Sequence, residues 1–187
     1  MASHTFEPIQ QRQVRVWDVI VRLFHWSLVA SVALAFLTED ARKLHEFFGY
    51  TMVGLIGLRL VWGLIGSHHA RFASFVPGPR RLVSYLVDMA RGRERRYLGH
   101  NPAGGAMVIA LLAMLGAIGW TGYLMGTDAY FGDERLEDIH ELLANILLVM
   151  IGLHVGGVIL ASLRHSENLV LAMITGQKRA DDETTKH

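Results

Sequence analysis

The stretch that decides the fold is residues 137–163, EDIHELLANILLVMIGLHVGGVILASL. It is apolar enough to cross a hydrocarbon layer about 30 Å thick, yet it carries His140 and His154. Fourteen residues of helix rise about 21 Å and stop about 40° short of four full turns. Both imidazoles therefore leave one face of one helix, at two depths. Ionisable groups at such depths are costly and usually functional.

Charge-poor runs recur four times in this 187-residue chain, at 19–37, 47–65, 104–126 and 142–163. Each is long enough for a transmembrane helix. The ionisable residues inside them are Arg22, His25, Arg59 and His154. We therefore expect an all-α membrane protein, with one domain over residues 1–187 and a four-helix bundle spanning about 17–37, 44–66, 103–126 and 137–163. A soluble bundle of buried helices is the alternative.

Cysteine is absent from the sequence, which excludes disulfides, thiolate iron–sulfur ligation and a covalent C-x-x-C-H haem site. The polar start of the chain, with Arg12 and Arg15 before the first apolar run, is similar to a signal peptide. We expect no cleavage, because this apolar run is too long for an ordinary signal core and contains His25.

The loops differ in charge. The 67–101 link has seven arginines against Asp88 and Glu94, whereas the 127–141 link has six acidic residues against Arg135. The positive-inside rule then places the basic link and both termini in the cytoplasm. The tail from Arg164 onward returns to the cytoplasm and is expected to end in a disordered segment of mixed charge.

Within the basic link, Leu82, Tyr85, Leu86 and Met89 recur at helical spacing between arginines. This pattern predicts a helix lying in the membrane interface. A nucleic-acid-binding patch is the alternative, but the flanking spans favour lipid headgroups and no nucleic-acid partner. After it, Asn101 and Pro102 are typical of the cap and first position of a helix.

The span order sorts four histidines by depth. His25 and His154 fall near the cytoplasmic side, and His45 and His140 fall near the outside. Two imidazole pairs stacked in a helical bundle are what two six-coordinate haem irons require. Packing or proton relay is the alternative for any single histidine. Zinc or copper fits less well, because one pair leaves a small ion with too few ligands.

A short internal repeat relates the second and fourth spans at an offset of 95 residues. His45-Glu46 matches His140-Glu141, and Gly57-Leu58-Arg59 matches Gly152-Leu153-His154. Arg59 thus occupies the position equivalent to the inner ligand, where it can pair with a haem propionate. Snorkelling to the interface is the alternative for Arg59. Arg22, one turn before His25, is a second propionate or headgroup candidate.

Three further histidines gather at the predicted cytoplasmic ends of the second and third spans, namely His68, His69 and His100. They could border a quinone pocket or exchange protons with it, although surface histidines are the simpler interpretation. Glu46 and Glu141 adjoin the outer ligands and could bind protons there; exposed interfacial charge is the alternative.

The ordered set of motifs resembles the prokaryotic cytochrome b561 family, which includes the b-type cytochrome subunits of membrane hydrogenases and formate dehydrogenases. The matching pieces are RLFHW at 22–26, His45-Glu46 with Gly49, RLVWG at 59–63, GHNP at 99–102, His140-Glu141 and His154. The resemblance implies a four-helix protein with two haem b groups in the bacterial cytoplasmic membrane. It also implies that the histidine of the first span shares a haem with the second histidine of the fourth span.

We therefore expect a transmembrane electron carrier in a respiratory chain, passing electrons between the quinone pool, ubiquinone or menaquinone, and a periplasmic or membrane redox partner. The acidic outer loop suits a positively charged partner. One alternative is an enzyme that oxidises superoxide near Arg42 and Lys43 and reduces quinone. Another is a membrane anchor subunit of a larger oxidoreductase. A histidine-bearing transporter is a further alternative, and the sequence leaves a homodimer open.

Overall fold

The structure, a computed structural model, describes residues 13–180. The elements in chain order are β1 (Gln13–Arg15), α1 (Val19–Leu37), α2 (Arg42–Ile65), α3 (Phe72–Phe75), α4 (Pro79–Ala90), α5 (Pro102–Met125), α6 (Glu134–Arg164), α7 (Leu169–Thr175) and β2 (Gln177–Arg179).

Four of these helices, α1, α2, α5 and α6, are long and apolar enough to cross a membrane. This confirms the predicted all-α membrane fold with four spans. The longest is α6 with 31 residues, which extends beyond the predicted span at both ends. A helix of that length rises about 46 Å, so its charged ends reach past a hydrocarbon layer of about 30 Å.

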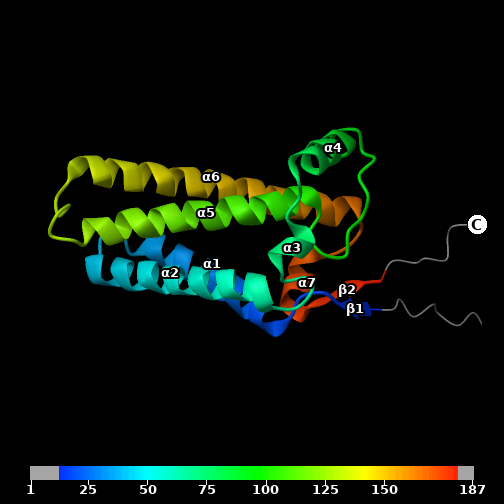
Figure 1. Cartoon of the computed structure of the whole chain (residues 1–187), viewed down its shortest axis with the longest axis horizontal. Coiled ribbons are helices and arrows are strands. Elements are labelled where there is room, and N and C mark those ends of the chain that lie inside the picture. Colours follow the sequence, from blue (N-terminus) through cyan, green and yellow to red (C-terminus); the bar gives the residue numbers. More distant parts are fainter. Residues whose placement is uncertain (1–12, 181–187) are drawn as a thin grey trace, which may run out of the picture.

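The four long helices form two hairpins (Figure 1). α1 packs on α2, α5 packs on α6, and α2 packs on α5 to join the hairpins. The α1–α2 turn and the α5–α6 loop share one end of the bundle, which we call the loop end. The strands, α3, α4 and α7 gather at the opposite end, which we call the cap end. Both termini of the described chain therefore lie on one side of the bundle.

The starts of the spans follow from side-chain caps. Asp18 accepts a hydrogen bond from the Val21 amide at 2.8 Å, and Asn101 accepts one from the Gly104 amide at 2.7 Å. Pro102 occupies the first turn of α5, which confirms the predicted start of this helix. Asp133 caps α6, and Glu134 and Glu137 lie in its first turn. Their negative charges stabilise the helix, because the N-terminal end of its dipole is positive.

The core of the bundle draws on all four spanning helices. It consists of Phe24, Met52, Ile56, Leu112, Leu115, Ile118 and Leu147. Outside this core the long helices keep exposed apolar faces, for example at Val149 and Leu153 of α6, which are 64% and 63% exposed. In water such faces would be costly, but in a bilayer they lie against acyl chains that are equally apolar.

Four small elements of the cap end, β1, β2, α3 and α7, were not expected from the sequence. β1 pairs antiparallel with β2, with Val14 opposite Lys178, and α7 lies between α6 and β2. The backbone amides of Val16 and Trp17 donate to the Gly176 carbonyl at 2.9 and 3.2 Å. The segment after Arg164 is thus folded as far as β2, while the chain end predicted to be disordered lies outside the described residues from 181 onward.

Glu167 ties the cap end together. Its carboxylate lies 2.9 Å from Arg96 Nη2 and 3.3 Å from Lys178 Nζ, and it accepts a hydrogen bond from the Arg179 amide. Burial acts to raise the pKa of Glu167, but the hydrogen bond from Arg96, the charge of Lys178 and the Arg179 amide outweigh it. The net result is a pKa below the ordinary value.

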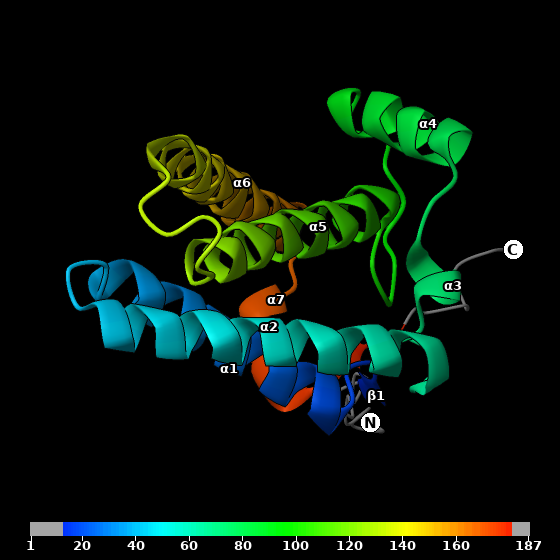
Figure 2. The same ribbon diagram turned by 60° about the vertical axis from the view of Figure 1, so that its left-hand side comes forward.

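The predicted helix in the basic link is α4, which stands beside the end of α5 and away from α1 and α2 (Figure 2). Tyr85 is buried, whereas Val83, Leu86 and Val87 are exposed. Since Arg80 and Arg81 are exposed on the same helix, α4 combines an apolar surface with cationic groups, as interfacial helices do.

Candidate haem sites

The outer pair of histidines meets in space. His45 from the first turn of α2 and His140 from α6 have ring centroids 6.1 Å apart. Two metal–imidazole bonds of about 2 Å, plus about 1 Å from each nitrogen to its ring centre, give a separation of about 6 Å. The spacing therefore fits one metal ion between the two rings.

Hydrogen bonds occupy one nitrogen of each ring of this pair. His45 Nδ1 lies 2.9 Å from the Ala35 carbonyl oxygen, so Nδ1 must carry the proton and donate. His140 Nδ1 lies 2.8 Å from Thr121 Oγ1, whose hydroxyl donates to the Ile118 carbonyl. In each ring the Nε2 lone pair is then available to bind a metal. Metal-bound histidines usually donate their other ring N–H to such a partner, which fixes the tautomer and the orientation of the ring.

Sequence reasoning missed Ala35 and Thr121. No sequence pattern marks a threonine that reaches a histidine 19 residues later, because the contact depends on how two helices rotate against each other. Gly122, the next residue, contributes to the fit. A Cβ built there would lie 3.3 Å from His140 Cε1, so glycine gives the ring its room.

The inner pair, His25 on α1 and His154 on α6, lies towards the cap end. His154 is close enough to interact electrostatically with His25. His25 Nδ1 is buried without a hydrogen-bond partner, which leaves a buried polar atom that a ligand contact would satisfy. Among the described helices, α1 and α6 do not pack closely on each other, so this pair comes from two helices that are not packed neighbours.

Leu147 lies midway along α6 between the two levels, seven residues from each histidine. It is 2% exposed, and it is the one buried residue of this helix. Its neighbours in the core come from α1, α2 and α5. An apolar layer therefore separates the outer and inner pairs.

Arg59 is 4% exposed on α2 near the cap end. Its Nη2 donates to the Ala70 carbonyl at 3.0 Å, and its guanidinium lies 4.8 Å from the ring centroid of Phe72. Its Nη1 is buried without a partner. An inward-facing guanidinium with a spare donor fits a carboxylate ligand such as a haem propionate.

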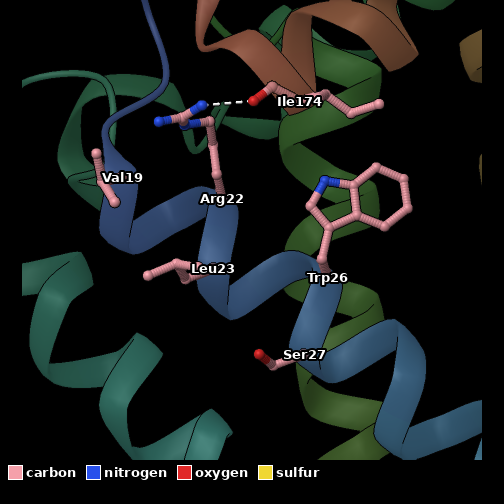
Figure 3. A pocket seen from close by; sticks show the side chains of 6 residues that line it. All are labelled: Val19, Arg22, Leu23, Trp26, Ser27 and Ile174. Carbon is pink, nitrogen blue, oxygen red and sulfur yellow. Dashed lines mark hydrogen bonds between the residues drawn. The ribbon is translucent and has the colours of Figure 1, made fainter.

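Arg22 lies at the edge of a groove of about 420 Å³ on α1. Figure 3 shows its guanidinium pointing towards the Ile174 carbonyl of α7, to which Nη1 donates at 2.5 Å. Trp26 Nε1 also approaches α7, with its nitrogen 3.4 Å from the Met173 carbonyl oxygen. Both side chains thus hold the start of α1 to α7, and Arg22 retains a buried Nε without a partner.

The loop end bears on the superoxide alternative. Arg42 forms an ion pair with Glu46 at 2.7 Å and lies 5.2 Å from the Phe131 ring centroid. A paired arginine attracts anions weakly, because its charge is compensated. Of the two basic residues singled out there, Lys43 forms no ion pair with any residue in the described part of the chain.

Comparison with known proteins identifies the chain's relatives. The family model described as prokaryotic cytochrome b561 matches residues 16–176. The chain belongs to this family. A b-type cytochrome of this family implies haem b, and the histidine-rich interior just described suits that cofactor.

The curated relatives of this cytochrome include two with the name "Probable Ni/Fe-hydrogenase B-type cytochrome subunit". The one from Azotobacter vinelandii is 23% identical over 93% of this chain and 92% of its own length. The one from Rhizobium leguminosarum bv. viciae is 20% identical over 96% of this chain and 95% of its own length. The comparison with solved structures gave no significant match.

Family and fold together make this cytochrome a multi-pass membrane electron-transfer protein of the bacterial inner membrane type. Its relatives imply a redox partner in addition to the lipid bilayer.

Proposed function

We propose that this cytochrome carries electrons across the bilayer through two haem b groups. His45 and His140 would hold the outer haem, and His25 and His154 the inner one. Bound haem supplies reversible one-electron chemistry at iron. The observation that supports the proposal most strongly is the spacing of His45 and His140, whose ring centroids lie 6.1 Å apart on helices that do not pack closely together.

The protein would hold the two haem groups, orient their ligands and keep water away from the layer between them. The Ala35 carbonyl and the Thr121 hydroxyl fix the outer imidazoles with Nε2 free. Arg59 offers its spare Nη1 to a propionate of the inner haem, where it would compensate a buried negative charge. Leu147 and its core neighbours keep water from the layer between the two levels.

The partners follow from the relatives and from the loops. Relatives named as Ni/Fe-hydrogenase cytochrome subunits favour an extramembrane oxidoreductase as electron donor, with ubiquinone or menaquinone as acceptor. The basic cap end would face the cytoplasm and the acidic α5–α6 loop the periplasm. Because Arg42 is compensated by Glu46, the superoxide-oxidising alternative is less favoured than the relay.

Haem counting in single and double variants tests this proposal. The purified wild type should contain two b haems per chain by pyridine haemochrome assay and a reduced-minus-oxidised spectrum. His45→Ala and His140→Ala should each leave one haem, and the double variant should also leave one, because both ligands serve the same site. The single variants His25→Ala and His154→Ala, and their double variant, should each lose the inner haem and keep the outer one.

His165→Ala, at the end of α6 and outside both pairs, is the matched control and should keep both haems. A wild type with fewer than two haems, or a His45/His140 double variant that loses both, would contradict the assignment. Reduction of the haems by superoxide without a partner, faster than by any quinol, would favour the enzyme over the relay.

A further inference from the structure

A second polar site lies at the cap end, outside the two histidine pairs. It is a pocket of about 150 Å³ between the end of α2, the start of α4 and the start of α5. Its lining contains His68, His69, Arg81, Tyr97 and His100, with small or apolar residues completing the wall. We call it the cap pocket.

The polar lining of the cap pocket consists of groups that can donate hydrogen bonds, and no carboxylate lines it. The rings of His68 and His69 are 5.1 Å apart and perpendicular. Arg81 lies 5.8 Å from the centroid of the Tyr97 ring, so this aromatic ring supports the guanidinium beside the pocket. The lining therefore brings several hydrogen-bond donors together and contains no acidic side chain to accept from them.

His100 forms the inner wall of the cap pocket. Its ring lies between Phe75 and Trp17, with centroid distances of 4.5 and 4.7 Å, and its Nδ1 is buried without a partner. Burial is the main cause that lowers the pKa of His100 to about 3, and the nearby Arg59 and Lys178 act in the same direction. His100 is therefore a neutral ring that lies among basic groups.

Carboxylates near the cap end are engaged elsewhere. Glu94 pairs with Arg164 at 2.6 Å, and Glu167 pairs with Arg96 and Lys178. Asp18 accepts hydrogen bonds from Trp62 Nε1 and Ser67 Oγ. These three carboxylates are engaged and none lines the cap pocket, so the anion we look for there is one supplied from outside the described residues.

We propose that the cap pocket binds a phosphate group, with Arg81 and His69 as its main donors and His100 at its base. Arg81 can donate charge-assisted hydrogen bonds to phosphate oxygens, which are short and strong, and each neutral imidazole can donate one N–H. The volume fits a group of this size and is too small for a quinone ring with its tail, since sites for drug-sized ligands measure about 300–1,000 Å³.

The phosphate could belong to a lipid headgroup or be free in solution. The neighbouring α4 carries exposed apolar residues and arginines, so the pocket would lie at the level of the headgroups if α4 lies in the interface. Either source offers the same chemistry to the same donors.

The test uses the full-length, haem-loaded protein in two arms. In the first, the delipidated protein is titrated with phosphatidylglycerol and bound lipid is counted by native mass spectrometry. In the second, inorganic phosphate is titrated and binding is followed by ³¹P line broadening. The test variant combines Arg81→Gln with His69→Gln, and the matched control combines Arg80→Gln with His165→Gln. Arg80 is the neighbour of Arg81 on α4 and does not line the pocket.

We expect the test variant to bind at least one of the two ligands about ten-fold more weakly than wild type, while the control binds as wild type does. Loss confined to phosphatidylglycerol identifies a lipid headgroup, and loss of inorganic phosphate binding identifies a free phosphate. Equal binding by test and control variants in both arms would overturn the proposal. An unchanged haem spectrum in both variants verifies folding.

Discussion

The hydroxyl of Thr121 lies 2.8 Å from Nδ1 of His140 and donates a hydrogen bond to the Ile118 carbonyl. This chain of two hydrogen bonds runs from the backbone of α5 to a ring on α6. It fixes both the orientation and the tautomer of the outer ligand, which the helix backbone alone would leave free.

Thr121→Val should remove this support without changing the size of the side chain. Loss of a second-shell hydrogen bond typically lowers metal affinity about 10–100-fold, so the outer haem should dissociate faster. Its reduction potential should rise, because a less basic imidazole stabilises ferric iron less well. Haem transfer to an acceptor protein and a spectroelectrochemical titration measure these two effects.

Thr127→Val is the control for this change. The Thr127 hydroxyl donates to the Leu124 carbonyl just beyond the end of α5 and touches neither pair. Equal potentials and haem retention in the two variants would show that the Thr121 hydroxyl does not act on the outer haem.

Arg59→Met should lower the potential of the inner haem and leave that of the outer haem unchanged. A buried cation favours the reduced iron. At about 10 Å and an effective dielectric constant of about 20, two unit charges interact by about 1.7 kcal/mol. This corresponds to about 70 mV for one electron. Potentiometric titration of both haems gives the answer.

Arg71→Met, a change of an exposed arginine at the same end of the bundle, should move neither potential by a comparable amount. A shift of both haems in Arg59→Met, or of neither, would contradict a local electrostatic role. It would leave Arg59 as a structural contact between α2 and the Ala70 carbonyl.

Leu147→Ala should destabilise the bundle. The side chain is 2% exposed, and Leu→Ala in a tight core costs about 2–5 kcal/mol. For a protein of this size, 1 kcal/mol lowers Tm by about 2–4 °C, so a loss of at least several degrees is expected in a thermal melt followed by haem absorbance. Leu148→Ala, next to it and 48% exposed, should melt close to wild type. Equal melts would mean that the layer between the two levels is loosely packed.

Glu167→Gln should loosen β1. Because the pKa of Glu167 is lowered in the folded protein, its contribution to stability is present above the ordinary carboxyl pKa and is lost as pH falls below about 4.5. Hydrogen exchange at the amides of Val16 and Trp17 should therefore be faster in the variant at neutral pH. The difference from wild type should shrink in acid.

Glu39→Gln, in the α1–α2 turn at the opposite end of the bundle, is the control and should leave these amides protected. Unchanged protection in Glu167→Gln would show that the sheet holds without the ion pairs.

The sequence predicts the spans well because membrane helices must be long and apolar, and hydropathy records both properties. It also orders the histidines by depth, since depth follows from position along a span. It could not predict β1 and β2, which are three residues long and therefore too short for an alternating pattern to stand out. The roles of Arg22 and Thr121 depend on tertiary contacts with α7 and α6, which no local pattern encodes.

The pairing of β1 with β2 joins residues 13–15 to residues 177–179. During translation the first of these strands leaves the ribosome more than 150 residues before its partner (177 − 15 = 162). The helix that carries His25 is therefore made long before its partners, because α6 and β2 lie near the other end of the described chain. Maturation of this cytochrome is for that reason a late event, completed only when α7 has been made and β2 has paired with β1.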